Sequence, residues 1–190
     1  MTAAKLGSLT TAELGKLFPI TVVDPDPSWP KIYASERDLL VRTLPSNVLV
    51  RIEHIGSTAI ARLRAKPTID MLLEISAGTD LQSLAALFNR LEYKVNTRPD
   101  KPPPHLTLVK GYTERGFSGQ SFHVHVRYKD THDEIYFRDY LRTHPATARE
   151  YEVLKDALAE KFRNDREAYT EGKSEFVKRV VGMARESYSR

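Results

Sequence analysis

The sequence predicts an α+β protein in which a mixed β-sheet is flanked by helices and followed by a helical C-terminal part. Strand-like and helical periodicities alternate over about residues 18–128. From about residue 133 onward, apolar side chains recur only at helical spacing. Strands and helices in this order are expected to pack their apolar faces together in layers, which favours one sheet covered by helices.

Length and composition are those of an ordinary globular protein. The chain has 190 residues, of which 41% are hydrophobic and 28% are charged. This composition excludes collagen-like and broadly disordered classes, and a chain of this size can bury a sizeable core. We expect residues 1–190 to form a single domain, with a core at about 18–128 and a helical part at about 133–190.

Cysteine is absent from the sequence, which bears on both chemistry and location. Disulfides, thiolate metal sites and cysteine nucleophiles are excluded, and the absence fits a reducing compartment. The N-terminal segment lacks the apolar stretch of a secretory signal, and no run approaches the ~18 apolar residues of a membrane span. We therefore expect a cytoplasmic protein without a membrane segment.

The charge balance is mildly positive, with 29 Lys and Arg against 25 Asp and Glu. These basic residues are dispersed along the chain and form no long run. The pattern carries no strong nucleic-acid signal. A small nucleotide or another phosphate-bearing molecule suits this mild excess better.

In the first half of the chain, turn-forming residues separate the periodic segments. Ser28 can cap a helix whose first turn contains Pro30, where a missing N–H costs little. Apolar and more polar side chains alternate over residues 48–53, as expected of a strand. The expected elements are a helix over 11–18, a β-rich segment over 20–23, a helix from 28 to 44, strands over 48–55 and 68–75 with a short helix after the Gly56-Ser57 turn, and a helix over 80–91.

The second half begins with a loop over residues 96–104, which contain four prolines. Residues 105–110 and 121–127 predict two strands of a hairpin, joined through the glycine-containing segment 111–119. The His144-Pro145 pair separates the next two helices. The expected helices cover residues 135–141, 146–162 and about 165–183.

A Gly-Ser turn after the first strand is the sharpest local feature. Gly56 allows the backbone to approach a ligand closely, and free N–H groups where a helix starts favour phosphate. Asp70 follows inside the next strand, where a carboxylate can hold Mg²⁺ against the same phosphate. The alternative is structural, with Gly56 making a turn and Ser57 capping a helix.

Two histidines stand at alternate positions of a predicted strand. Side chains alternate along a strand, so His123 and His125 share one face. Two imidazoles at this spacing can chelate one transition-metal ion, and Asp70 on a neighbouring strand completes a set of two histidines and one carboxylate. The alternative is a polar sheet face to which both histidines form hydrogen bonds.

Several separated motifs together resemble the GrpB family. The segments IEHIGSTA at 52–59 and AKPTID at 65–70 are the closest. The segment FRDYLR at 137–142, followed by His144-Pro145, also resembles the family, as does YTE at 169–171 followed by Lys173 and Phe176. The resemblance extends from about residue 18 to the C-terminus.

This resemblance implies a nucleotidyltransferase-like fold and a metal-dependent nucleotidyltransferase. In that superfamily the Gly-Ser turn, here Gly56, Ser57 and Thr58, holds nucleotide phosphates, and strand carboxylates bind a divalent metal. Asp70 matches the first carboxylate, but Leu72 occupies the place of the second. Residues 60–62, Ile-Ala-Arg, also differ from the Val-Pro-Gly frequent in the family.

Four further residues are candidates for the site, each with a structural alternative. His54 abuts the Gly-Ser turn but can also pack beneath it. Lys66 can reach a phosphate from its place before Pro67, although a surface lysine is the simpler interpretation. Arg138 and Arg142 share one helix face and can bind an anionic acceptor or remain solvated.

The sequence therefore favours metal-dependent nucleotidyl transfer, with phosphate at Gly56, Ser57, Thr58 and Lys66. Asp70, His123 and His125 are the candidate catalytic and metal-binding residues, for Mg²⁺, Mn²⁺ or Zn²⁺. The absent second carboxylate keeps a non-catalytic nucleotide-binding or metabolite-binding module open. A histidine-dependent phosphohydrolase is the third interpretation.

Overall fold

The computed structural model describes residues 6–130 and 132–188. The first residues of the N-terminal segment, which is not expected to be a secretory signal, lie outside this range. The chain begins with the short helices η1 (Leu6–Ser8) and α1 (Thr11–Leu17), followed by the longer α2 (Trp29–Thr43). Thr10 caps α1, since its hydroxyl accepts from the Glu13 N–H while the Glu13 carboxylate accepts from the Thr10 N–H. This reciprocal pair satisfies two N–H groups that a helix start leaves free.

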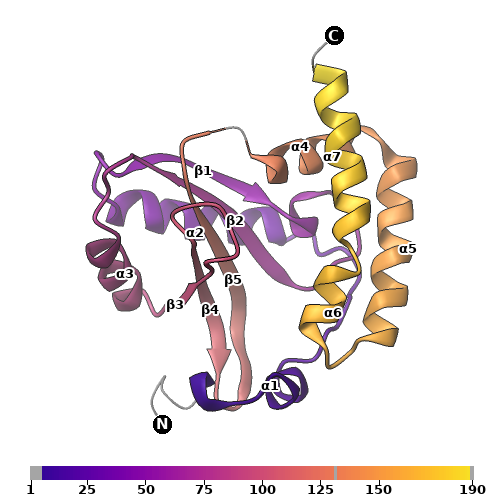
Figure 1. Cartoon of the computed structure of the whole chain (residues 1–190), viewed down its shortest axis with the longest axis horizontal. Coiled ribbons are helices and arrows are strands. Elements are labelled where there is room, and N and C mark those ends of the chain that lie inside the picture. The colour runs from indigo at the N-terminus through magenta and orange to yellow at the C-terminus, as the bar shows by residue number, and fades with distance from the viewer. Residues whose placement is uncertain (1–5, 131, 189–190) are drawn as a thin grey trace.

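A five-stranded mixed sheet forms the centre of the molecule (Figure 1). The strand order is β1-β2-β5-β4-β3; β2 and β5 run parallel, and the other neighbours are antiparallel. This arrangement confirms the predicted α+β class and the mixed sheet. The strands are β1 (Leu49–Ile55), β2 (Thr68–Ile75), β3 (Lys94–Thr97), β4 (Leu106–Thr113) and β5 (Gly116–Tyr128).

One face of the sheet packs against α2 and α3 (Leu81–Arg90). Alternate residues of β2, Ile69 and Met71 among them, belong to this core together with Leu40 and Phe88 from the helices. Fully burying one such side chain contributes about 1.5–3 kcal/mol. Since side chains alternate along a strand, the residues between them, including Asp70, point to the opposite face.

The C-terminal part is helical, as predicted. Its helices stand together beside the sheet and enclose a second, smaller apolar core with Ile60 and Leu63, which follow the Gly-Ser turn (Figure 1). This core therefore attaches the C-terminal helices to the segment that leads from β1 to β2. The helices are α4 (Asp133–Thr143), α5 (Pro145–Lys161), α6 (Arg166–Glu171) and α7 (Ser174–Tyr188).

Three secondary-structure predictions in the second half of the chain need correction. The predicted loop over 96–104 begins inside the edge strand β3, whose KVNT sequence is too polar to predict a strand. Strands β4 and β5 extend beyond the predicted hairpin, so only Glu114 and Arg115 connect them. The predicted last helix is two helices, because the chain turns at Gly172 and Lys173 between α6 and α7.

The β-rich segment 20–23 also differs from the prediction. It forms no strand, and only Val23 pairs, in an isolated antiparallel bridge with Ala65. The Ile20 N–H instead donates to the Arg163 carbonyl, 2.7 Å away, near the end of α5. The segment thus passes between the sheet and the C-terminal helices, where its backbone finds two unrelated partners.

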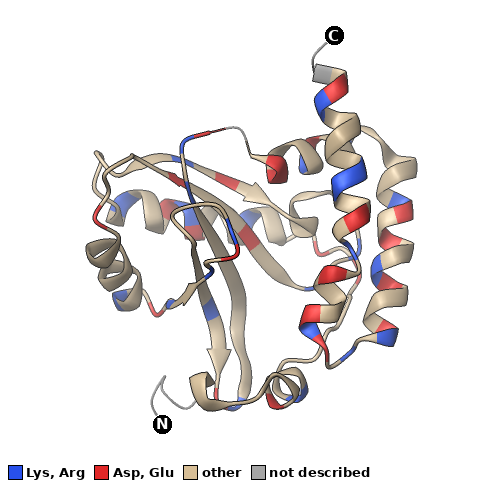
Figure 2. Ribbon diagram, in the orientation of Figure 1, with Lys and Arg blue, Asp and Glu red and all other residues tan. Residues whose placement is uncertain are grey.

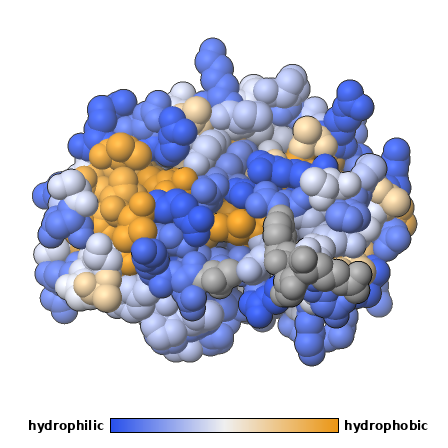
Figure 3. All heavy atoms as spheres, turned by 90° about the horizontal axis from the view of Figure 1, so that it is seen from above, coloured by the Kyte–Doolittle hydropathy of each residue, from blue (hydrophilic) through white to orange (hydrophobic). Residues whose placement is uncertain are grey.

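The surface is mostly hydrophilic in the view of Figure 3, with an apolar patch toward the side on which α3 lies. Basic and acidic residues are interspersed along α5, α6 and α7, without a continuous basic stripe in the view of Figure 2. Within the described residues, no helix combines the length and apolarity needed to cross a membrane.

Candidate metal and phosphate site

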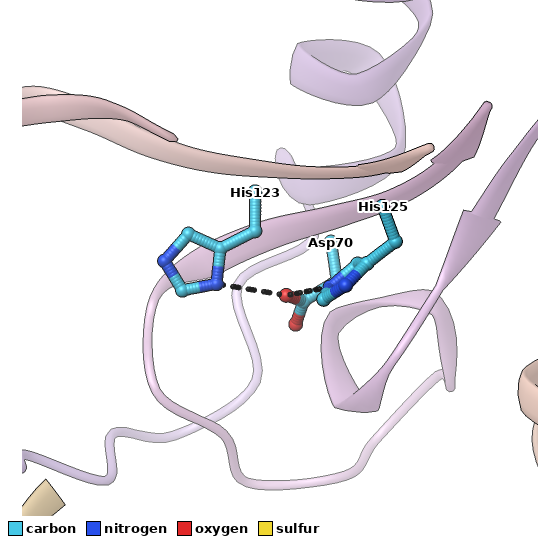
Figure 4. Close-up of side chains that lie close together, drawn as sticks. All are labelled: Asp70, His123 and His125. Atoms are coloured by element: carbon cyan, nitrogen blue, oxygen red, sulfur yellow. Dashed lines mark hydrogen bonds and ion pairs between the residues drawn. The ribbon is translucent and has the colours of Figure 1, made fainter. Parts of the chain in front are cut away.

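Parallel pairing of β2 and β5 brings the candidate metal ligands together. Asp70 is the register partner of His123, and Leu72 is the partner of His125. Paired residues on adjacent strands project from the same face, so the carboxylate and both imidazoles lie on the face opposite the main core. Figure 4 shows both rings directed at the Asp70 carboxylate.

The three side chains offer ligand atoms at close range. Asp70 Oδ1 lies 3.2 Å from His123 Nδ1 and 3.5 Å from His125 Nε2. All three ligand atoms lie within 4.8 Å of one another, and all three side chains are half-buried. Ligands ~2.1 Å from a tetrahedral ion lie about 3.4 Å apart, so the two carboxylate–imidazole distances already fit one ion.

His125 occupies the place that a second strand carboxylate would face. Leu72, at the position where the resemblance implies that carboxylate, is fully buried and lies beside His125 in the parallel register. Glu74, two residues further along β2, bonds instead to Arg51 at 2.5 Å. The available donor set is therefore one oxygen and two imidazole nitrogens, which suits Zn²⁺ or Mn²⁺ better than Mg²⁺.

The protonation states at the site suit metal binding. Burial acts to raise the pKa of Asp70, but hydrogen bonds with His123 and His125 outweigh it and hold this pKa far below the ordinary carboxyl range. Burial lowers the pKa of His123, although the charge of Asp70 opposes this effect. At neutral pH the carboxylate is thus ionised and His123 is neutral, as metal ligation requires.

Tyr112 orients the His123 ring, a role that the sequence did not reveal. Its hydroxyl lies 2.7 Å from His123 Nε2, and the two rings stack with centroids 5.6 Å apart. With Nε2 engaged by Tyr112, Nδ1 faces Asp70. A hydrogen bond to one ring nitrogen of a histidine fixes which nitrogen is available to a metal.

The Gly-Ser turn lies against the Asp70 carboxylate. Gly56 has φ 70°, in the left-handed region that side chains disfavour, and a Cβ there would meet Asp70 Oδ2 at 2.6 Å. Glycine is thus needed both for the turn and for its close approach to a candidate ligand. Ser57 opens the 3-10 helix η2 (Ser57–Ala59), and its side chain lies near the buried Tyr151.

Thr58 and His54 pack beneath the turn. The buried Thr58 hydroxyl donates to the Thr68 carbonyl at 3.0 Å, so it accepts from His54 Nε2, 3.1 Å away. Tyr33 stacks on the other side of the His54 ring, with centroids 4.5 Å apart. Burial lowers the pKa of His54 to about 4. The side chains of His54 and Thr58 are therefore occupied by protein groups and support the turn from below. This is the structural alternative stated for His54.

Arg138 and Arg142 of α4 hold the two ends of the turn. Arg138 is buried; it donates to the His54 carbonyl and to Glu53, both at 2.8 Å. Arg142 is more exposed and donates two hydrogen bonds to the Ala59 carbonyl. The solvated alternative does not describe Arg138, whose donors are occupied by protein groups. Both arginines brace the candidate phosphate site rather than line it.

Lys66 lies close to the site and is half-buried. Burial lowers its pKa to about 7, the nearby charges of Arg166 and Lys173 act in the same direction, and the charge of Asp70 opposes them. A cation so close to its neutral form is typical of functional sites. The sequence indicated Lys66, but not the two cations from the C-terminal helices that accompany it.

Two surface hollows lie away from these residues. One is lined mainly by residues 76–80 and α3, and the other by Arg51, Glu74, Lys129 and their neighbours. The first brings together no convergent metal ligands, and Asp80 there caps α3 by accepting from the Gln82 N–H. The candidate site is therefore the group of ligand atoms around Asp70 and not either of the two hollows.

The chain matches the model of the family described as GrpB protein over residues 19–182, and it belongs to the GrpB family. The resemblance read from its motifs is therefore confirmed. The crystal structure of the conserved protein GrpB from Enterococcus faecalis superposes with a TM-score of 0.77 at 29% identity. That similarity covers 90% of this chain and 100% of the other.

Proteins from several bacteria are similar to this chain over most of its length. UPF0157 protein PA4798 of Pseudomonas aeruginosa is 42% identical over 166 residues, which cover 87% of this chain and 67% of that protein. Glutamate-rich protein GrpB of Alkalihalophilus pseudofirmus is 30% identical over 173 residues, covering 85% and 94%. A dephospho-CoA kinase of Mycolicibacterium paratuberculosis is 26% identical over 186 residues, and the match spans 45% of that longer protein.

Proposed function

We propose that this protein binds a divalent transition-metal ion and uses it to hold a phosphate-bearing small molecule for nucleotidyl transfer. The observation that carries the proposal is the convergence of Asp70, His123 and His125 within 4.8 Å, directly beneath Gly56. Few structural needs explain a half-buried carboxylate with two imidazoles against a glycine turn. A metal and an anion together account for all four residues.

Each residue has a defined part in this proposal. Asp70 and the two histidines would hold the ion, which would neutralise phosphate charge and polarise a phosphoryl oxygen. Ser57 and the Gly56 backbone would bind the phosphate, with Lys66 beside them. If only one of His123 and His125 holds the ion, the other imidazole can accept the proton of the attacking group.

The leucine at position 72, where a second carboxylate is expected, favours a second candidate function. With one carboxylate instead of two, the site resembles less closely a nucleotidyltransferase that uses paired acidic residues. The same metal and phosphate ligands would serve a histidine-dependent phosphohydrolase, or a module that binds a nucleotide or metabolite without transforming it. The released product separates these functions, since nucleotidyl transfer releases pyrophosphate and hydrolysis of a terminal phosphate releases orthophosphate.

Calorimetric titration of ATP with and without Mn²⁺ tests the proposal. We expect Mn²⁺-dependent binding in the parent and in Asp38→Asn, a control at a partly exposed position of α2, and its loss in Asp70→Asn. Because transfer needs an acceptor to attack the α-phosphorus, product analysis uses the same protein incubated with ATP, Mn²⁺ and a set of hydroxyl-bearing acceptors, and should then detect pyrophosphate. Equal Mn²⁺-dependent affinities in the parent and Asp70→Asn would refute the site, and orthophosphate as the product would favour the phosphohydrolase.

A further inference from the structure

Two half-buried lysines from distant parts of the chain lie beside the same tyrosine. Lys66 Nζ and Lys173 Nζ are 5.5 and 4.3 Å from the centre of the Tyr169 ring, which is 1% exposed. Lys66 precedes β2, whereas Lys173 lies between α6 and α7. The turn between these two helices thus brings a second cation to the beginning of β2.

These cations lack local compensation. Across residues 6–130 and 132–188, no carboxylate forms an ion pair with either ammonium group. Burial, together with the charge of Arg166, lowers the pKa of Lys66 to about 7 and that of Lys173 to about 8. Contact with an aromatic ring compensates a buried cation only in part, by about 0.5–2 kcal/mol.

Arg166 links this cluster to the candidate metal ligands. Its guanidinium donates to the Tyr112 hydroxyl at 3.4 Å, and that hydroxyl lies 2.7 Å from His123 Nε2. Asp70 is the acidic group whose charge favours the protonated form of both lysines. If Asp70 binds a metal ion, its charge is taken up by that ion, and the three cations then need a counter-charge from outside the protein.

Lys155 is close by but has a structural role. It is 2% exposed, lies over the Tyr151 ring, and donates to the Arg64 carbonyl. Lys66 and Lys173 have no comparable acceptor among the described hydrogen bonds of the chain. The difference separates a lysine that stabilises the fold from two that are available to a ligand.

We propose that Lys66, Lys173 and Arg166 bind an oligophosphate, a group with at least two linked phosphates, beside the metal site. Once a divalent ion is present, the three cations, the ion and Asp70 together carry a net charge of up to about +4, of which a single phosphate compensates only about half. A linked chain of phosphates carries more negative charge and can contact both the ion and the lysines. The inference rests on the proposed function for its metal-bound end. It assigns the substrate class and gives the α6–α7 turn a direct role in binding.

Calorimetry with inorganic tripolyphosphate and orthophosphate tests this inference, in chelator-treated protein and after addition of Zn²⁺. Salt of about 0.15 M limits non-specific attraction to surface charges. The variants are Lys66→Gln and Lys173→Gln, with Lys178→Gln as the control, since Lys178 is an exposed lysine of α7. Thermal unfolding of each variant verifies that the fold is retained.

We expect the parent and Lys178→Gln to bind tripolyphosphate more tightly than orthophosphate. Each of the other substitutions should weaken tripolyphosphate binding about tenfold, the usual effect of losing one charge-assisted hydrogen bond, and leave Zn²⁺ affinity unchanged. Equal tripolyphosphate affinities in all four proteins, or equal affinity for the two anions, would overturn the inference while leaving the metal site standing. Failure of the parent to bind Zn²⁺ would instead refute the proposed function, and the metal-free titrations would still decide the role of the lysines.

Discussion

Asp70 and His123 are direct register partners on parallel strands, and their Oδ1 and Nδ1 atoms lie 3.2 Å apart. A slip of one residue between β2 and β5 would place the two side chains on opposite faces of the sheet. The register is maintained by the opposite face, where Ile69 and Val124 are fully buried in the main core. Packing on one face of the sheet thereby determines the geometry of the candidate site on the other.

The Gly-Ser turn provides the first prediction. Gly56→Ala should weaken Zn²⁺ binding and lower the free energy of unfolding by about 1–3 kcal/mol, because the added Cβ meets Asp70 and φ is unfavourable. Gly78→Ala is the matched control, since Gly78 has φ 83° but no atom within 4 Å of the added Cβ. Calorimetry and urea unfolding measure both quantities. If the two variants bind Zn²⁺ equally well, the contact with Asp70 has no influence on the metal site.

Tyr112 provides a prediction about positioning. Tyr112→Phe removes the hydroxyl that engages His123 Nε2, so Zn²⁺ affinity should fall about tenfold, the lower end of the usual effect of losing a hydrogen bond to a metal-binding histidine. Tyr128→Phe, at the far end of β5, should leave the affinity unchanged. Zn²⁺ titration at pH 7.5 compares them. An unaltered affinity in Tyr112→Phe would show that the ring of His123 is held by packing alone.

His54 predicts a pH-dependent stability. Its pKa is about 4 in the folded protein and 6.5 in the reference state, so the unfolded chain binds a proton that the folded chain excludes between these values. Stability should therefore be full above pH 6.5 and fall as the pH drops toward 4, by roughly 3 kcal/mol from this residue.

Urea unfolding at several pH values measures this effect. In His54→Gln the decrease should be smaller than in the parent by that amount, while the decrease that arises from His123, whose pKa burial also lowers, should remain. Parallel pH profiles for the two proteins would show that His54 does not titrate in this window.

Substitution of the two arginines of α4 should lower the free energy of unfolding by different amounts. Arg138→Met leaves Glu53 and the His54 carbonyl without their buried donor, which should cost roughly 2–3 kcal/mol, somewhat less than a fully buried pair because Glu53 is partly exposed. Arg142→Met removes more exposed contacts and should cost less than about 1 kcal/mol. Urea unfolding compares them, and equal losses would contradict the assignment of Arg138 as the buried brace.

Much of the fold was predictable because its signals are local. Alternation in β1 and β2 and helical spacing after residue 133 indicated the α+β class and the helical C-terminal part. Strand β3 was missed because a short polar edge strand depends on pairing with β4 rather than on its own composition. The division between α6 and α7 was also missed, since the helical spacing continues across it.

The candidate site was predictable only where residue type and spacing carry chemistry. The His-x-His pattern and a strand carboxylate indicated the metal ligands, and the structure places them together. Tyr112 and Arg166 gave no such signal, because their contacts arise when β4 pairs with β5 and α6 folds back toward the sheet. Lys173 lay inside a family motif, but only the tertiary structure places it beside Lys66 and Tyr169.

Zn²⁺ titration of the chelator-treated protein at pH 7.5 tests the central claim most directly. We expect one ion per chain in the parent, loss of this binding in Asp70→Asn and in His125→Ala, and unchanged binding in His144→Ala, an exposed histidine outside the site. Affinity should also fall as the pH becomes acidic, since imidazole ligands must be neutral to bind. A parent that binds no Zn²⁺, or that binds it equally well in all three variants, would contradict the account.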